Sequence, residues 1–71
     1  RDKMEKSRWI PCSQKRPAHR QAVIGCDKTG YVTRYEYDAE EPPCWVDDHE
    51  EFFQEDEVVA WMPLPEPYRK D

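Results

Sequence analysis

The chain has 71 residues, a formal net charge of −5 and 38% charged residues. A chain of this length forms one domain and buries only roughly 60% of the surface that its unfolded form exposes, so we expect marginal stability. The negative charge argues against general binding to nucleic acid or to an anionic membrane surface, because phosphates attract cations. No apolar run approaches the roughly 20 residues of a transmembrane helix, and no stretch has the apolar core of a secretory signal.

Aromatic residues supply most of the material for a core. Leu, Ile, Val and Phe together make up ten of the 71 residues, a share low enough to raise the question of disorder. Nine aromatic side chains argue for a folded domain, because each ring buries on the order of 150–250 Å². We therefore expect a single domain over residues 9–67 with a core made mostly of rings. A flexible arm or tag remnant at 1–8 and a tail at 68–71 flank it.

The first predicted element is a short strand over residues 9–12. Pro11 confines this strand to the edge of a sheet, because proline has no backbone donor. A polar, basic loop follows over residues 13–20. We interpret its cations as balancing the acidic half of the same fold, rather than as a phosphate site. These cationic side chains are Lys15, Arg16, His19 and Arg20.

A β-hairpin is the clearest element of the chain. Residues 21–26 and 31–37 predict two strands, and the turn at 27–30 ends in Gly30, which can take a positive φ. The second strand alternates regularly, so one face carries three tyrosines and a threonine. These are Tyr31, Thr33, Tyr35 and Tyr37.

The second half of the chain predicts two further strands around an ambiguous segment. Residues 44–46 and 57–61 fit short strands, and the second of them packs beside the hairpin. Residues 47–57 fit either a helix, with Asp48 and Glu51 spaced as in a capping box, or a solvated loop. The predicted fold is therefore mainly β, or small α+β. It has a three- to four-stranded antiparallel sheet and at most one short helix.

Three cysteines cannot all pair within one chain. Cys12, Cys26 and Cys44 are interpreted as reduced thiols of a cytosolic protein, with a disulfide between two of them as the alternative. With His19 and His49 they would suffice for a tetrahedral zinc site. However, the spacings are long, and neither a Cys-x-x-Cys nor a His-x3-His pair is present. We expect no metal and no cofactor, and keep a small zinc-binding module as an alternative.

Carboxylates are abundant, yet their number does not indicate catalysis. Acid–base catalysis needs pKa values shifted by burial or by close pairing in a cleft. A domain of this size has little room for a cleft, so we expect a protein without enzymatic activity.

Charge is unevenly distributed along the chain. Residues 1–34 hold nine Lys or Arg against three Asp or Glu, whereas residues 35–68 hold twelve Asp or Glu and neither Lys nor Arg. The acidic segment is either a solvated loop or an anionic surface that docks on a basic groove. Of two adjacent rings within it, one normally points inward and the other can anchor a contact. The candidate partner-binding residues are Asp47, Asp48, Glu50, Glu51, Phe52, Phe53, Glu55, Asp56 and Glu57.

The two ends of the chain share an aromatic–proline pattern. Trp9-Ile10-Pro11 stands near the front, and Trp61-Met62-Pro63-Leu64-Pro65-Glu66-Pro67 stands near the back. In this pattern the chain resembles a family of small phage and prophage domains of unknown function. Ala60 departs from it, because a His often precedes the tail Trp in that family. The resemblance implies a viral or mobile-element origin and a bacterial host cytoplasm, and it supplies no activity and no catalytic residue.

The leading hypothesis is a phage- or prophage-encoded acidic interaction protein. It would occlude a basic site on a host nucleic-acid-handling or defence protein, without touching nucleic acid or membrane itself. The alternative is a structural or assembly module that forms a homodimer or larger homo-oligomer through exposed rings and sheet edges.

Overall fold

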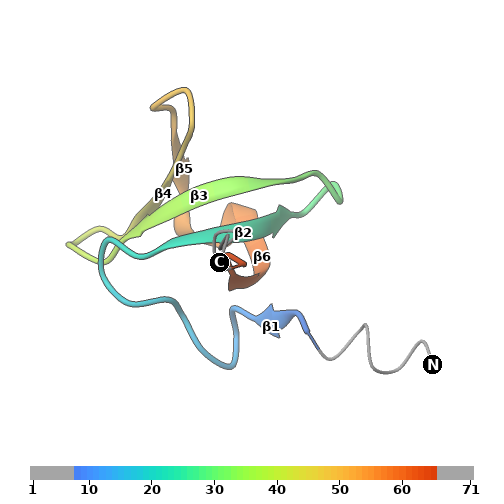
Figure 1. Cartoon of the computed structure of the whole chain (residues 1–71). Coiled ribbons are helices and arrows are strands. Elements are labelled where there is room, and N and C mark those ends of the chain that lie inside the picture. The colour runs from blue at the N-terminus through green and yellow to red at the C-terminus, as the bar shows by residue number, and fades with distance from the viewer. Residues whose placement is uncertain (1–7, 66–71) are drawn as a thin grey trace, which may run out of the picture.

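The computed structural model describes residues 8–65, so all but one residue of the predicted arm and the whole predicted tail lie outside the described part. Six strands and one 3₁₀ turn follow one another along the chain (Figure 1). They are β1 (Ile10–Pro11), β2 (Ala22–Asp27), β3 (Val32–Asp38), β4 (Cys44–Asp47), β5 (Phe52–Gln54), η1 (Glu55–Glu57) and β6 (Val58–Pro63). All six strands form one antiparallel sheet in the order β1-β6-β2-β3-β4-β5.

The mainly β prediction is confirmed, but the predicted number of three to four strands is wrong. The sheet takes up all five segments that were predicted as strands, and it gains a sixth strand, β5, inside the segment 47–57 that was expected to be a helix or a loop. Three residues are too few to show an alternating pattern. The acidic residues on both sides of them are unfavourable in strands, so the sequence does not predict this one. Pairing with β4 creates it, because the register places Phe53 opposite Trp45 on the core side of the sheet.

The predicted hairpin is confirmed as β2 and β3. Asp27 organises its turn: Oδ1 accepts hydrogen bonds from the Thr29 amide at 2.9 Å, the Thr29 hydroxyl at 2.7 Å and the Tyr31 amide at 3.0 Å. Gly30 has a φ of 94°, as the turn requires. One aspartate therefore closes the turn by satisfying three donors.

These bonds predict a pH effect on stability. The Thr29 hydroxyl, followed by backbone amides, lowers the pKa of Asp27 below its ordinary value. The contribution of Asp27 is therefore present above the unfolded-state value of about 3.9, and it is lost as pH falls through the lower folded-state pKa. We expect Asp27→Asn to destabilise the protein at pH 7 and to match the wild type in strong acid, as measured by urea unfolding at both pH values. In the Thr29→Ala variant, NMR titration should show a raised Asp27 pKa; an unchanged value would contradict this account.

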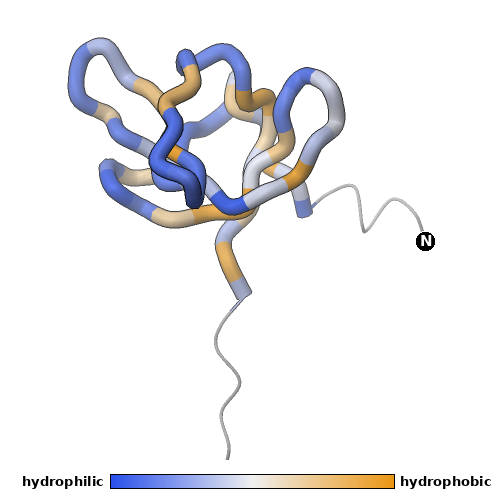
Figure 2. The backbone as a smooth tube through the Cα atoms, turned by 90° about the horizontal axis from the view of Figure 1, so that it is seen from above, coloured by the Kyte–Doolittle hydropathy of each residue, from blue (hydrophilic) through white to orange (hydrophobic). Residues whose placement is uncertain are grey.

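Rings form the core on one face of the sheet. The seven residues of the buried hydrophobic cluster are Cys12, Val23, Tyr35, Tyr37, Trp45, Val58 and Trp61. Trp45 lies between two tyrosines, with centroids 5.9 Å from Tyr35 and 4.8 Å from Tyr37. In Figure 2 the projecting loops of the tube are mostly hydrophilic, and apolar stretches lie between them. The expectation of an aromatic core is therefore met.

The basic loop between β1 and β2 lies across this core face. Its Pro17 is buried, and the indole Nε1 of Trp61 donates to the carbonyl of Lys15 at 2.8 Å. Arg16 forms an ion pair with Glu55 on the opposite side of the core. The loop therefore covers the rings and brings its cations to the acidic half, as predicted for the basic residues.

The two ends of the domain meet in the sheet. Ile10 of β1 pairs with Trp61 of β6, and the Cys12 amide donates to the Val59 carbonyl at 2.9 Å. β6 in turn pairs with β2, next to the hairpin, as predicted. The opposite edge of the sheet is β5, and it carries the predicted acidic site.

Candidate functional site

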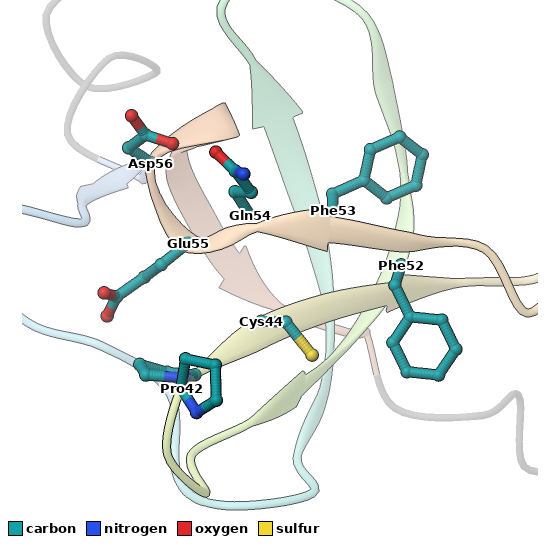
Figure 3. Close-up of a pocket in the computed structure, with 8 residues that line it drawn as sticks. Pro42, Cys44, Phe52, Phe53, Gln54, Glu55 and Asp56 are labelled. Carbon is teal, nitrogen blue, oxygen red and sulfur yellow. The ribbon is translucent and has the colours of Figure 1, made fainter.

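The β4–β5 hairpin presents two adjacent rings on opposite faces (Figure 3). Phe53 is half-buried and packs edge-to-face on Tyr35 with centroids 5.9 Å apart. Phe52 pairs with Val46 on the other face, and 71% of its surface is exposed. Strand alternation therefore makes Phe53 a core residue and leaves only Phe52 available to a partner.

Asp47 holds the turn of this hairpin. Its Oδ1 accepts the amides of His49 at 2.9 Å and Glu51 at 3.0 Å, and its own amide donates to the Glu51 carbonyl at 3.1 Å. Glu50 adopts the left-handed conformation with a φ of 63°. The helix that sequence reasoning placed after a cap at Asp48 is therefore absent, and Asp47 acts as a turn-forming side chain instead.

Two predicted acidic residues, Asp48 and Asp56, form exposed ion pairs with Arg or Lys within the molecule. Asp48 pairs with Arg34 at 3.0 Å, and Asp56 pairs with Lys28 at 3.9 Å. All four side chains are half exposed or more, and exposed pairs of this kind contribute about 0–1 kcal/mol each. Such weak pairs reduce the displayed negative charge and can still be exchanged for a partner's cations.

Glu55 is the most internally engaged carboxylate of the segment. Its Oε2 accepts the hydroxyl of Tyr37 at 3.0 Å, and the same carboxylate pairs with Arg16. Its backbone carbonyl accepts the indole N–H of Trp45 at 3.0 Å. Burial raises the pKa of Tyr37, so this phenol remains a hydrogen-bond donor at neutral pH. Glu55 therefore links the basic loop, through Arg16, to the core, through Tyr37 and Trp45. Its carboxylate lies at the margin of the core.

Two of the three remaining carboxylates of the acidic segment are exposed. Glu50 and Glu51 are exposed, and neither forms an ion pair within residues 8–65. Glu57 is half-buried, and its carbonyl accepts the Lys28 amide at 3.1 Å. Among the nine predicted residues, Glu50 and Glu51 are thus exposed without an ion pair in the described part, and Phe52 is exposed beside them. We call these three residues the tip patch.

A groove beside β5 was not predicted from the sequence. It has a volume of about 580 Å³ and is lined by Pro42, Pro43 and Cys44 together with Phe52 and residues 53–56 (Figure 3). In the sequence, Pro42 and Pro43 indicate only a break between strands, because proline cannot supply a ladder donor. The groove arises because β5 runs antiparallel to β4 and so ends beside Pro42 and Pro43. In the sequence, the only sign of this arrangement is that apolar residues occur both at 42–46 and at 52–53.

Comparison with known proteins places the chain in a family. A family model described as a protein of unknown function (DUF551) matches residues 8–68. The chain belongs to this family. The match includes both aromatic–proline segments on which the sequence resemblance was based. Neither the curated proteins nor the solved structures contain a significant match.

The five candidate zinc ligands of this DUF551 protein lie on four different segments. Cys12 and His19 lie in the covering loop, Cys26 in β2, Cys44 in β4 and His49 in the hairpin turn. Within residues 8–65 no three His, Cys, Asp or Glu side chains come together as a metal site would require. The zinc alternative therefore finds no support in the described part of the DUF551 fold.

The cysteines of this DUF551 protein are unpaired thiols, so the alternative of a disulfide has no counterpart in the structure. Burial raises the pKa of Cys12, and burial together with the nearby Asp38 charge raises that of Cys44. Both thiols are therefore protonated at neutral pH and poorly suited to act as nucleophiles or metal ligands.

No helix among the described residues is long and apolar enough to cross a bilayer.

Proposed function

We propose that this protein is a small acidic interaction protein that binds and occludes a basic site on a protein partner. The observation that carries the proposal is the tip patch, where Phe52 is 71% exposed beside two carboxylates that lack a cation within the described residues. Exposed rings at the centre of a charged surface are typical anchors of protein contacts. The charges would steer association, and the ring would contribute most of the binding energy.

The proposed partner is a host protein that handles nucleic acid or takes part in defence. A protein that binds nucleic acid displays a cationic track, and the tip patch offers the opposite charge. The proposed origin is a phage or prophage, and the proposed location is the bacterial host cytoplasm. Both rest on the aromatic–proline ends of the sequence. Occlusion of the partner's site requires no turnover, so we expect no enzymatic activity.

Charge reversal at the tip tests the proposal. We expect Glu50→Lys with Glu51→Lys to weaken the affinity for the partner at least about tenfold, because attraction becomes repulsion. The partner is first identified by affinity capture from host lysate, and its affinity for the purified variants is then measured at low and high salt. The matched control is Glu40→Lys with Glu41→Lys, which changes the net charge equally in the exposed loop between β3 and β4.

The two pairs of substitutions separate local docking from general charge effects. If both weaken binding equally, the tip patch has no special role. An affinity that is the same at both salt concentrations would also contradict electrostatic docking, since exposed charges are screened beyond about 10 Å at 0.1 M salt.

A further inference from the structure

The outer side of β5 has no neighbouring strand among residues 8–65. Within this described part, β5 ends the sheet order and pairs only with β4. The Asp47 amide bonds to the Glu51 carbonyl, and bonded pairs alternate along an antiparallel ladder. The next bonded pair is therefore Trp45 with Phe53. The backbone N–H and C=O groups of Phe52 and Gln54 consequently face away from the sheet.

Native proteins normally protect such an edge, because unpaired backbone groups invite another strand. The opposite edge of this sheet is β1, a strand of only two residues that contains Pro11. β5 has no proline, and Phe52 makes its surroundings apolar. The groove beside it, lined by Cys44 and the prolines at 42–43, can take a side chain from an added strand (Figure 3).

The surrounding charges select the occupant. Glu50 and Glu51 precede β5, and Asp56 follows it; all three are exposed. Two copies of this chain paired through β5 in antiparallel fashion would bring these carboxylates together, and like charges opposite one another are destabilising. A strand that carries Lys or Arg finds complementary charges at both ends instead.

We propose that β5 receives an extended, Lys- or Arg-bearing segment of the partner as a seventh strand of the sheet. Its backbone pairs with Phe52 and Gln54, and one of its apolar side chains enters the groove. This is recognition by strand addition, in which backbone bonds provide affinity and pockets provide specificity. The inference rests on the proposed function and adds the conformation and chemistry of the partner segment.

Gln54 allows the edge to be blocked without disturbing the fold. Its φ of −64° and ψ of 155° match those of proline. Its N–H faces outward, so proline at this position removes a donor from the edge and none from the β4–β5 ladder. Gln54→Pro should therefore fold normally, and Gln54→Ala is the control that keeps the N–H. Hydrogen exchange of the Phe53 amide checks that the ladder is intact.

The test uses three labelled nine-residue peptides and fluorescence anisotropy with the full chain. The first alternates Lys and Val, the second carries N-methyl groups on the amides that would face β5, and the third has Glu in place of Lys. We expect the first to bind, the second to bind at least about tenfold more weakly, and the third not to bind. Gln54→Pro should weaken the first peptide about three- to tenfold, and Phe52→Ala at least about fivefold.

The outcomes distinguish this inference from the proposed function. Strand addition is wrong if methylation and Gln54→Pro leave affinity unchanged while tip charge reversal abolishes it; the charged surface would then act alone. It is also wrong if no peptide binds. A dimer in sedimentation that Gln54→Pro converts to monomer would show that a second copy occupies the edge, and would overturn the choice of occupant.

Discussion

Replacing Trp45 with alanine should remove a large part of the protein's stability. The indole is fully buried between Tyr35 and Tyr37, and its N–H donates to the Glu55 carbonyl. Truncating a buried Trp costs about 3–5 kcal/mol, whereas 71 residues at 0.05–0.15 kcal/mol each give a total of about 4–11 kcal/mol. Few aliphatic side chains are available to fill the cavity, because the chain contains few Leu, Ile and Val residues.

Urea unfolding followed by near-ultraviolet circular dichroism measures this effect. Phe52→Ala is the matched control, because it removes an exposed ring from the same hairpin. We expect it to change the free energy of unfolding by no more than about 0.5 kcal/mol. Trp45→Phe should lie between the two, since it keeps an aromatic ring and loses the bond to Glu55. A Trp45→Ala variant as stable as wild type would show that the core is not organised around this indole.

Replacing Gly25 with alanine should destabilise the protein, although alanine normally stabilises a strand by about 0.5–1 kcal/mol relative to glycine. Gly25 is buried in β2 between β3 and β6. An added Cβ would lie 2.6 Å from Cδ2 of Tyr35 and 3.2 Å from Cγ1 of Val58. Tyr35 cannot move aside easily, because Trp45 and Phe53 pack against it. We expect a loss of about 1–3 kcal/mol from overpacking.

Two comparisons show whether lack of space is the cause. Gly30 has open space around the position of a Cβ but a φ of 94°, so Gly30→Asn should cost less than Gly30→Ala, since asparagine tolerates this conformation. Adding Tyr35→Leu to Gly25→Ala should cost less than the sum of the single changes, because the shorter side chain relieves the contact. Strict additivity would contradict the steric explanation.

Local patterns made part of the candidate site predictable. Two adjacent rings in an extended segment must point to opposite faces, so one of Phe52 and Phe53 was expected in the core. Which of them it is depends on the register between β4 and β5. The groove was equally out of reach, because it needs Pro42 and Pro43 to lie beside a strand that begins nine residues after Pro43.

The displayed charge could not be predicted because it depends on partners distant in the sequence. Asp48 and Glu55 both belong to the acidic segment and look equivalent in the sequence. In the fold, Asp48 meets Arg34 at the surface, and Glu55 meets Arg16 and the Tyr37 hydroxyl at the margin of the core. The acidic segment is visible in the sequence, while the smaller tip patch within it emerges only from the fold.

The sequence by itself determined the β2–β3 hairpin, its turn and an aromatic core, because alternation and turn chemistry depend on residues within a few positions of one another. Tertiary structure alone decided that segment 47–57 contains the edge strand β5, that the basic loop covers the rings, and that Glu50 and Glu51 stay displayed. These features arise from pairing across the sheet and from ion pairs between the two halves of the chain. Their energies depend on distances in space that the order of residues does not contain.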